Sequence, residues 1–100
     1  MIARIWHGRV LEKDFEAYTS FLKEVAVPDY SNTAGFVKLT FLRRLEDSIG
    51  HFTLITYWKS LEEIKNFAGD DFEKAKYYPE DDNFLLEFEE KVVQHEVFTE

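Results

Sequence analysis

Some segments of the chain have the hydrophobic pattern of β-strands, and others have hydrophobic residues at helical spacing. The order of these segments predicts the fold. Runs of β-branched and aromatic residues, bounded by turn residues, predict four strands. These strands cover residues 2–9, 36–45, 51–58 and 91–98. Polar residues 46–50 predict a hairpin loop between the second and third strands. Residues 15–26 carry hydrophobic side chains at helical spacing, which predicts a helix that Asp14 caps and Pro28 ends.

The segment behind the third strand predicts two further helices, because the capping-box pattern occurs twice there. The two boxes are Ser60 with Glu63 and Asp70 with Glu73. The first predicts a helix that ends at Gly69, and the second a short helix over residues 71–78 that Pro79 closes. Residues 84–88 keep helical spacing for one more turn. The order β-α-β-β-α-β, with an extra small helix, is that of the ferredoxin-like α+β fold, which we expect to form one four-stranded antiparallel sheet.

The second and third strands carry hydrophobic residues on both faces of the predicted sheet. Phe52 and Leu54 point to one face, and Ile55 and Tyr57 to the other. Helices packed on one side of a sheet cover only one of these faces. We therefore expect a homodimer in which the second face packs against the sheet of another copy.

The size and composition of the chain are those of a single folded domain. Its 100 residues, of which 45% are hydrophobic and 17% aromatic, predict a single folded domain over residues 1–100. No hydrophobic run reaches the roughly 18 residues that span a bilayer, and no signal peptide is visible. With no cysteine, the chain has neither disulfides nor thiolate chemistry. These features predict a cytoplasmic protein that does not bind membranes.

The charge of the chain argues against one kind of partner. Twelve basic and twenty acidic residues give a net charge of −8, and residues 70–71 and 80–82 are dense in acid. Such a surface repels a phosphate backbone, so we do not expect nucleic acid as a partner. We interpret the acidic turn at residues 80–82 as solvated, since adjacent carboxylates in a turn diverge.

With this order of elements, the chain resembles the antibiotic biosynthesis monooxygenase domain family of the dimeric α/β-barrel superfamily. Four segments carry the resemblance, which covers nearly the whole chain. They are IARIWHGRV, LITYWKSLEEIKNFAG, DDFEKAKYYPEDDNFLLEFE and VVQHEVF. The resemblance implies a ferredoxin-like fold, two sheets paired into a barrel, and a pocket between each sheet and its helices. Members of the family include cofactor-free oxygenases of aromatic polyketides, quinol oxygenases and haem-degrading enzymes.

The haem-degrading members differ from this chain at three positions. They use an Asn near the end of the first strand, a Trp on the second helix and an axial His beyond it. His7, Phe67 and Tyr77 stand at these places here. A Tyr phenolate can ligate ferric haem, so haem binding through Tyr77 stays open although haem degradation is not expected.

The cofactor-free oxygenases imply an aromatic pocket with a base. The resemblance gives His7 as the candidate base and Tyr77 as a second catalytic residue, with no metal or other cofactor. The expected pocket-lining residues are Trp6, Trp58, Phe67, Phe72, Tyr78 and Arg43. A dimer that only binds a small aromatic molecule, or fills the pocket with its own side chains, is the alternative.

Each of these residues also has an ordinary structural interpretation. A histidine on a strand is often simply hydrogen-bonded or part of an interface, Trp58 suits a core position, and Arg43 suits a surface ion pair. His7, His51 and His95 stand on strands that the family places side by side. We expect no metal site from them, because the first and third strands are expected to run parallel, which would separate His7 from His51.

Overall fold

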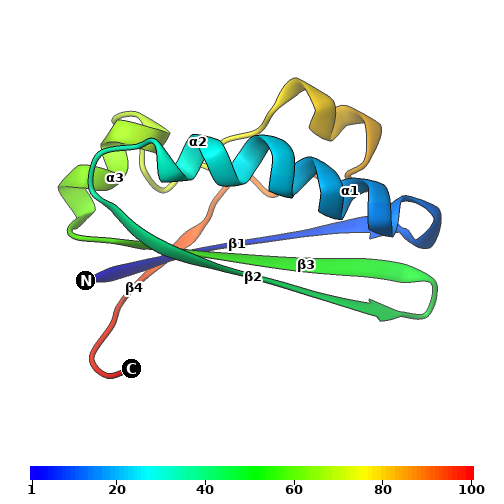
Figure 1. Cartoon of the computed structure of the whole chain (residues 1–100), viewed down its shortest axis with the longest axis horizontal. Helices are drawn as coiled ribbons and strands as arrows, with labels where there is room; N and C mark the ends of the chain where they lie inside the picture. The colour runs from blue at the N-terminus through cyan, green and yellow to red at the C-terminus, as the bar shows by residue number, and fades with distance from the viewer.

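A computed structural model describes residues 1–100, and it contains one antiparallel sheet of four strands. The strands are β1 (Ile2–Leu11), β2 (Phe36–Glu46), β3 (Ile49–Trp58) and β4 (Val93–Glu96). They lie in the order β2-β3-β1-β4, and every neighbouring pair is antiparallel (Figure 1). This arrangement confirms the ferredoxin-like α+β fold predicted from the sequence.

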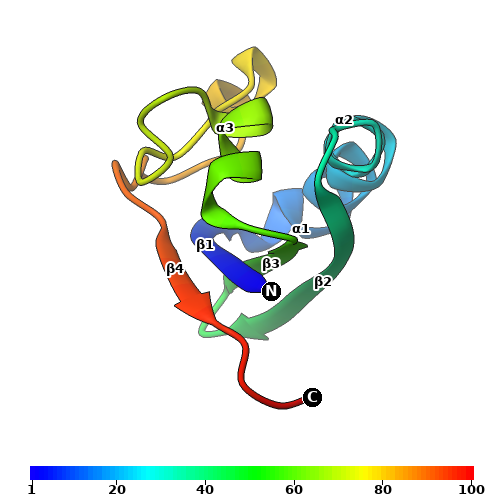
Figure 2. The same cartoon turned by 90° about the vertical axis from the view of Figure 1, so that its left-hand side faces the viewer.

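The helices all lie on one face of this sheet (Figure 2). A 3-10 turn (Glu12–Asp14), α1 (Phe15–Phe21), a π-helical turn (Leu22–Ala26) and α2 (Val27–Ser31) follow one another as a continuous helical rod. The prediction that Pro28 ends the helix was therefore wrong. The amide of Val27 bonds back to Leu22, five residues earlier, and this wider turn places Pro28 in the first turn of α2, where its missing N–H is tolerated.

The second predicted helix is present as α3 (Leu61–Ala68), and its ends are those that the sequence indicates. The Ser60 side chain accepts a hydrogen bond from the amide of Glu63, at 3.3 Å. Gly69 follows the helix with φ of 84°, a backbone conformation that favours glycine. None of the helices is long and apolar enough to cross a membrane.

The short helix predicted over residues 71–78 does not form. Residues 70–92, which we call the covering segment, instead run over the core as irregular chain with one 3-10 turn (Pro79–Asn83). The amide of Ala75 donates to Glu90 O at 2.9 Å, and the amide of Val92 donates to Glu73 O at 2.8 Å. These long-range backbone bonds compete with the local helix. The predicted fourth strand is shortened to Val93–Glu96, and within the helical turn expected at residues 84–88 the amide of Leu86 instead donates to Arg9 O at 2.9 Å.

The hairpin between β2 and β3 is tighter than the predicted loop. Only Asp47 and Ser48 lie outside the strands, and both have positive φ, 52° and 65°. Two successive positive φ angles match the twist of a two-residue hairpin, so the strands continue to Glu46 and Ile49.

The hydrophobic core lies between the sheet and the helices. Its largest fully buried side chains include Trp58, Tyr18 and Ile64. Phe52 and Leu54 are also buried there, and the neighbouring residues of β3 point to the opposite, helix-free face of the sheet, which we call the open face. The two-sided pattern of β3 is therefore as the sequence indicates.

Candidate functional site

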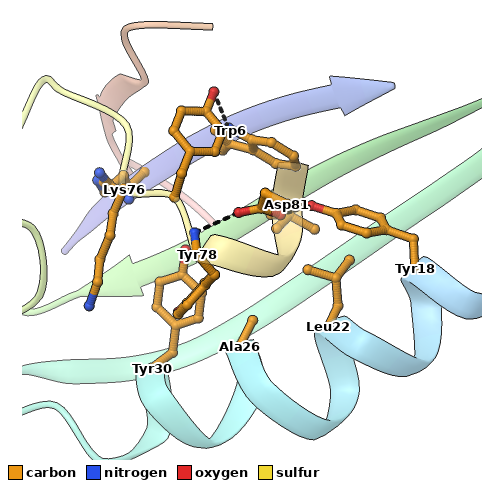
Figure 3. A pocket seen from close by; sticks show the side chains of 11 residues that line it. Trp6, Tyr18, Leu22, Ala26, Tyr30, Lys76, Tyr78 and Asp81 are labelled. Carbon is orange, nitrogen blue, oxygen red and sulfur yellow. Dashed lines mark hydrogen bonds between the residues drawn. The ribbon is translucent and has the colours of Figure 1, made fainter. Parts of the chain in front are cut away.

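A small cavity lies in the core between β1, the helical rod and the covering segment. Its volume is about 20 Å³, which holds about one water molecule. The lining residues come from these three parts and from β3 (Figure 3): Arg4, Trp6, Tyr18, Leu22, Ala26, Tyr30, Leu54, Lys76, Tyr77, Tyr78 and Asp81. Leu22 and Ala26 belong to the π-helical turn, a feature that often occurs at functional sites.

Asp81 is the buried acid of this cavity. Its side chain is only 3% exposed, so the expectation that the acidic turn is solvated was wrong for this residue. Its carboxylate accepts hydrogen bonds from the Tyr78 amide at 2.7 Å and from the Tyr18 hydroxyl at 3.1 Å (Figure 3). Burial raises the pKa of Asp81 although both hydrogen bonds favour the ionised form. A carboxyl group of this kind is suited to proton transfer.

Four tyrosines line the cavity, and three of them, Tyr18, Tyr30 and Tyr78, are kept neutral by burial. Burial raises the pKa of Tyr30 to about 12, and it also raises the pKa of Tyr18 and of Tyr78. The Tyr78 hydroxyl donates to Asp29 at 2.6 Å, and Lys76 donates to the same carboxylate oxygen at 3.1 Å. Burial alone would raise the pKa of Asp29, but these two bonds outweigh it and lower the pKa. Asp29 thus stays ionised and ties the covering segment to α2.

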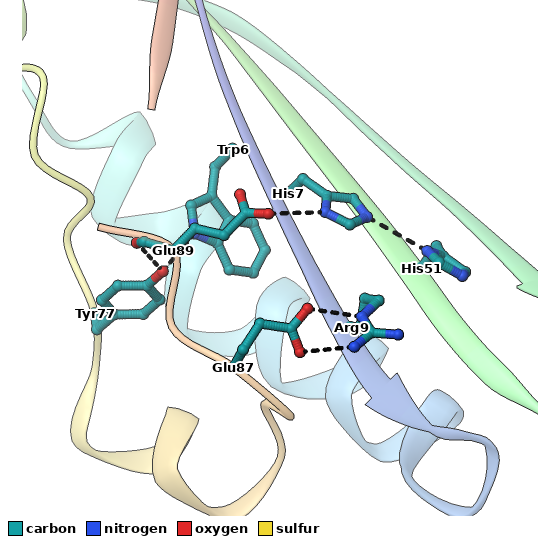
Figure 4. Close-up of polar contacts among 7 residues, drawn as sticks. All are labelled: Trp6, His7, Arg9, His51, Tyr77, Glu87 and Glu89. Atoms are coloured by element: carbon teal, nitrogen blue, oxygen red, sulfur yellow. Dashed lines mark hydrogen bonds and ion pairs between the residues drawn. The ribbon is translucent and has the colours of Figure 1, made fainter. Parts of the chain in front are cut away.

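Tyr77 closes the cavity beside β1. Its hydroxyl accepts a hydrogen bond from Trp6 Nε1 at 3.2 Å and donates to the carbonyl oxygen of Glu89 at 2.5 Å (Figure 4). The two rings meet edge to face with centroids 6.2 Å apart. Burial raises the pKa of Tyr77, so its phenol keeps its proton. In this arrangement Tyr77 holds the covering segment against β1.

Of the eight residues that the sequence assigns to the site, Trp6, Tyr77 and Tyr78 line the cavity. The other five lie elsewhere: His7, Arg43, Trp58, Phe67 and Phe72. Tyr30 stacks on Phe67 at 4.2 Å and fills the space in front of Trp58, so both rings belong to the core. Phe72 packs against the outside of the core.

Arg43 lies at the helix side of β2, away from the cavity. Its guanidinium donates to Glu16 at 2.7 Å and lies 4.5 Å from the centroid of the Phe15 ring. This is the surface ion pair that the sequence offered as the alternative.

His7 lies on the open face, on the opposite side of the sheet from the cavity. Its Nδ1 lies 3.3 Å from Glu89 Oε1, and its Nε2 lies 3.4 Å from Nδ1 of His51 (Figure 4). The expectation that His7 and His51 are far apart was wrong, because β1 and β3 are antiparallel and bring the two side chains together. His95 pairs with Ala3 at the far end of β1, and no group of three potential ligands could hold a metal ion.

Sequence reasoning missed five polar residues of the cavity, namely Arg4, Tyr18, Tyr30, Lys76 and Asp81. One available signal was the spacing of Tyr18, Leu22, Ala26 and Tyr30, which repeats every four residues. A second was Arg4, which stands between hydrophobic residues in the first strand. Nothing in the local sequence distinguishes Asp81 from its acidic neighbours.

No protein-family model and no curated protein sequence matches the chain. Among solved structures, the chain is similar to MhuD, in a crystal structure of a mutant with two manganese protoporphyrin IX molecules bound per active site. The two chains are 14% identical with a TM-score of 0.62, and the match covers 100% of this chain and 97% of that chain. The likeness shows a shared fold. Fold and site together define this chain as a ferredoxin-like α+β protein with a buried polar cavity between sheet and helices.

Proposed function

We propose that the protein is a cofactor-independent monooxygenase of small phenolic, polyketide-like or quinol substrates, held between the sheet and the helices. The observation that carries the proposal is the buried Asp81 carboxyl group in a cavity walled by aromatic rings. Burial raises its pKa, which brings a carboxylate closer to the range in which it acts as a general base. The ferredoxin-like fold shared with MhuD, which binds a planar aromatic ligand, further supports a ligand site in such a fold.

In the proposed reaction, Asp81 removes a proton from the substrate, and the resulting carbanion or phenolate transfers electrons directly to O2. When a ring CH2 group becomes a carbonyl group, one oxygen atom of O2 enters the product. The other leaves as water with the two hydrogens of the CH2 group. The substrate thus supplies all the electrons. The hydroxyl group of Tyr30 is a neutral donor that can hold the substrate oxygen, whereas the Tyr78 hydroxyl already donates to Asp29.

The test is oxygen consumption by the purified protein with a panel of anthrones and quinols. We expect uptake with at least one member, and isotope-labelled O2 should place one labelled atom in the new carbonyl group. His7→Ala should keep the rate, because His7 lies on the other face of the sheet. Loss of the rate in His7→Ala would move the site to the open face, and no uptake across the panel would reject the proposal.

A second function, binding of a small aromatic molecule without turnover, is favoured by the size of the cavity. About 20 Å³ is far below the several hundred Å³ of a typical ligand pocket, so the covering segment has to move before a substrate enters. Saturable binding of an anthrone or quinol, with no oxygen consumption, would identify this function.

A porphyrin does not fit the cavity as it stands. Its volume is too small, and the one candidate ligand, Tyr77, has its hydroxyl engaged with Trp6 and Glu89. We therefore expect hemin titration to give no saturable shift of the Soret band. A stoichiometric shift that is lost in Tyr77→Phe and kept in Tyr57→Phe would contradict this expectation.

The proposed enzyme is a homodimer formed through the open face of the sheet. Ile5, Ile55, Leu42 and Val93 place hydrophobic side chains on that face, where Leu42 is 49% and Val93 56% exposed. Burial of such a surface against a second copy is favourable.

We expect the protein to sediment as a dimer at micromolar concentration and Ile55→Glu to sediment as a monomer, since the change buries an unpaired charge. Leu61→Glu is the matched control, because Leu61 is exposed at the start of α3, far from the open face. A monomeric wild-type protein would refute the dimer.

A further inference from the structure

We infer that the cavity binds its ligand as an oxyanion, with the negative charge of the ligand held against the guanidinium of Arg4. This inference rests on the proposed function for the choice of cavity, and it adds the charge that the ligand carries.

Arg4 is the one buried basic residue of the protein. It is 2% exposed and projects from the helix side of β1, where Thr56 and Asp81 are the other buried polar residues. Burial lowers the pKa of Arg4, a sign of a charge taken out of water. Charges in such places are normally paired with an opposite charge.

No carboxylate of the protein pairs with Arg4. None of the ion pairs includes it. Its Nη2 donates to the Lys74 carbonyl at 3.0 Å, its Cζ lies 5.6 Å from the centroid of the Phe67 ring, and its Nε has no hydrogen-bond partner. Arg4 thus lines the cavity, and its guanidinium keeps one unused donor at Nε.

Asp81 lines the same cavity and is not paired with Arg4 either. A buried cation and a buried anion therefore face one cavity without neutralising each other. A ligand O–H group placed between Arg4 and Asp81 gives each of these two residues a partner. Its proton passes to Asp81, its oxygen becomes negative opposite Arg4, and the total charge of the site stays the same.

The ligand class follows from the shape of the two partners. A planar guanidinium is best matched by a planar, delocalised oxyanion, and the cavity walls include the rings of Trp6, Tyr30 and Tyr78. An aromatic carboxylate and a phenolate share this chemistry.

Two probe pairs test the inference by calorimetry. Benzoate and benzamide have the same shape and differ in charge, so the wild-type protein should bind benzoate at least about tenfold more tightly. Arg4→Met should lose this preference, and Arg9→Met should keep it, because Arg9 pairs with Glu87 at the protein surface. 4-Nitrophenol, whose ionised form absorbs in the visible range, should bind as the phenolate in the wild type and as the phenol in Arg4→Met.

If the wild type prefers benzoate to benzamide but binds nitrophenol as the neutral phenol, the site takes carboxylates. If it binds nitrophenol as the phenolate but binds benzoate and benzamide equally, the site takes phenolates. Equal binding of benzoate and benzamide by the wild type, together with nitrophenol bound as the neutral phenol, overturns the inference without any variant. Unchanged preferences in Arg4→Met do the same.

Thermal unfolding of the ligand-free protein separates this role from a structural one. If Arg4 only holds the Lys74 carbonyl, Arg4→Met lowers the unfolding temperature. We expect the same or a higher temperature, because the change removes a buried charge that has no partner. If Arg4→Met does not fold, this expectation fails and Arg4 is structural.

Oxygen consumption has no part in these measurements, so a protein that prefers benzoate and consumes no oxygen contradicts the proposed function and not this inference.

Discussion

Asp81→Asn should lower the rate of oxygen consumption by a factor of about 10² to 10⁴, the usual contribution of a positioned general base. The amide has nearly the same size as the carboxylate and stays in the same place, but it cannot take up the proton. Because Asp81 is 3% exposed and lines the cavity, no other carboxylate of the lining can replace it. Initial rates measured with the best substrate of the panel give the comparison.

Asp82→Asn is the matched control, because Asp82 is the exposed neighbour on the same turn. Its rate should stay within about twofold of the wild type, as expected for a surface position. A rate in Asp81→Asn equal to that in Asp82→Asn would exclude Asp81 as the base.

The pH dependence of stability gives a readout of Asp81 that needs no substrate. Since burial raises its pKa above the ordinary value of 3.8, the folded protein binds this proton more tightly than the unfolded chain. The contribution of Asp81 to the free energy of unfolding therefore falls as the pH rises from about 3.8 through the pKa of the folded state, while Asp29, whose pKa is lowered, contributes in the opposite direction in both variants. Urea unfolding at several pH values should show this fall as the difference between Asp82→Asn, which keeps the Asp81 contribution, and Asp81→Asn, which lacks it.

Trp58→Ala should destabilise the fold by about 3–5 kcal/mol, the usual cost of removing a large aromatic side chain from a core. Trp58 is fully buried, and its ring contacts Tyr30, Phe36 and Phe67 with centroids 5.6–6.5 Å apart. The vacated space cannot collapse, because β3 and α3 hold it on two sides. Urea unfolding followed by far-UV circular dichroism measures the loss.

Trp58→Phe is the control for this change, since it keeps most of the aromatic contact and loses the hydrogen bond from Nε1 to Thr56, which is 2.9 Å long. We expect it to cost less than half as much as Trp58→Ala. A cost of less than about 1 kcal/mol for Trp58→Ala would mean that this part of the core is loosely packed.

Most of the fold could be predicted from local sequence. The strands, the Ser60 cap and Gly69 each depend on residues within a few positions of one another, and all three are present. The largest error falls in residues 70–92, where the Asp70 and Glu73 pattern favours a helix but backbone bonds to residues some fifteen positions later prevent it. Pairing over that distance leaves no local pattern in the sequence.

The site was harder to predict than the fold for a related reason. Aromatic residues as a class are typical of a pocket wall, and Trp6, Tyr77 and Tyr78 line the cavity. Whether Asp81 lines the cavity depends on how the covering segment folds. Asp81 and Asp82 are adjacent acids, and only the fold decides which one is buried.

The π-helical turn has a consequence for the rotational phase of the helical rod. In a regular α-helix, a residue four positions on is rotated by about 40° around the axis, so three such steps rotate a side chain by about 120°. Tyr18, Leu22, Ala26 and Tyr30 are three such steps, and all four line one cavity. The wider turn at Leu22–Ala26 offsets part of that drift. The number of residues in this turn therefore sets which face of the rod meets the sheet, and a one-residue deletion there would turn Tyr30 away from the cavity while leaving Tyr18 in place.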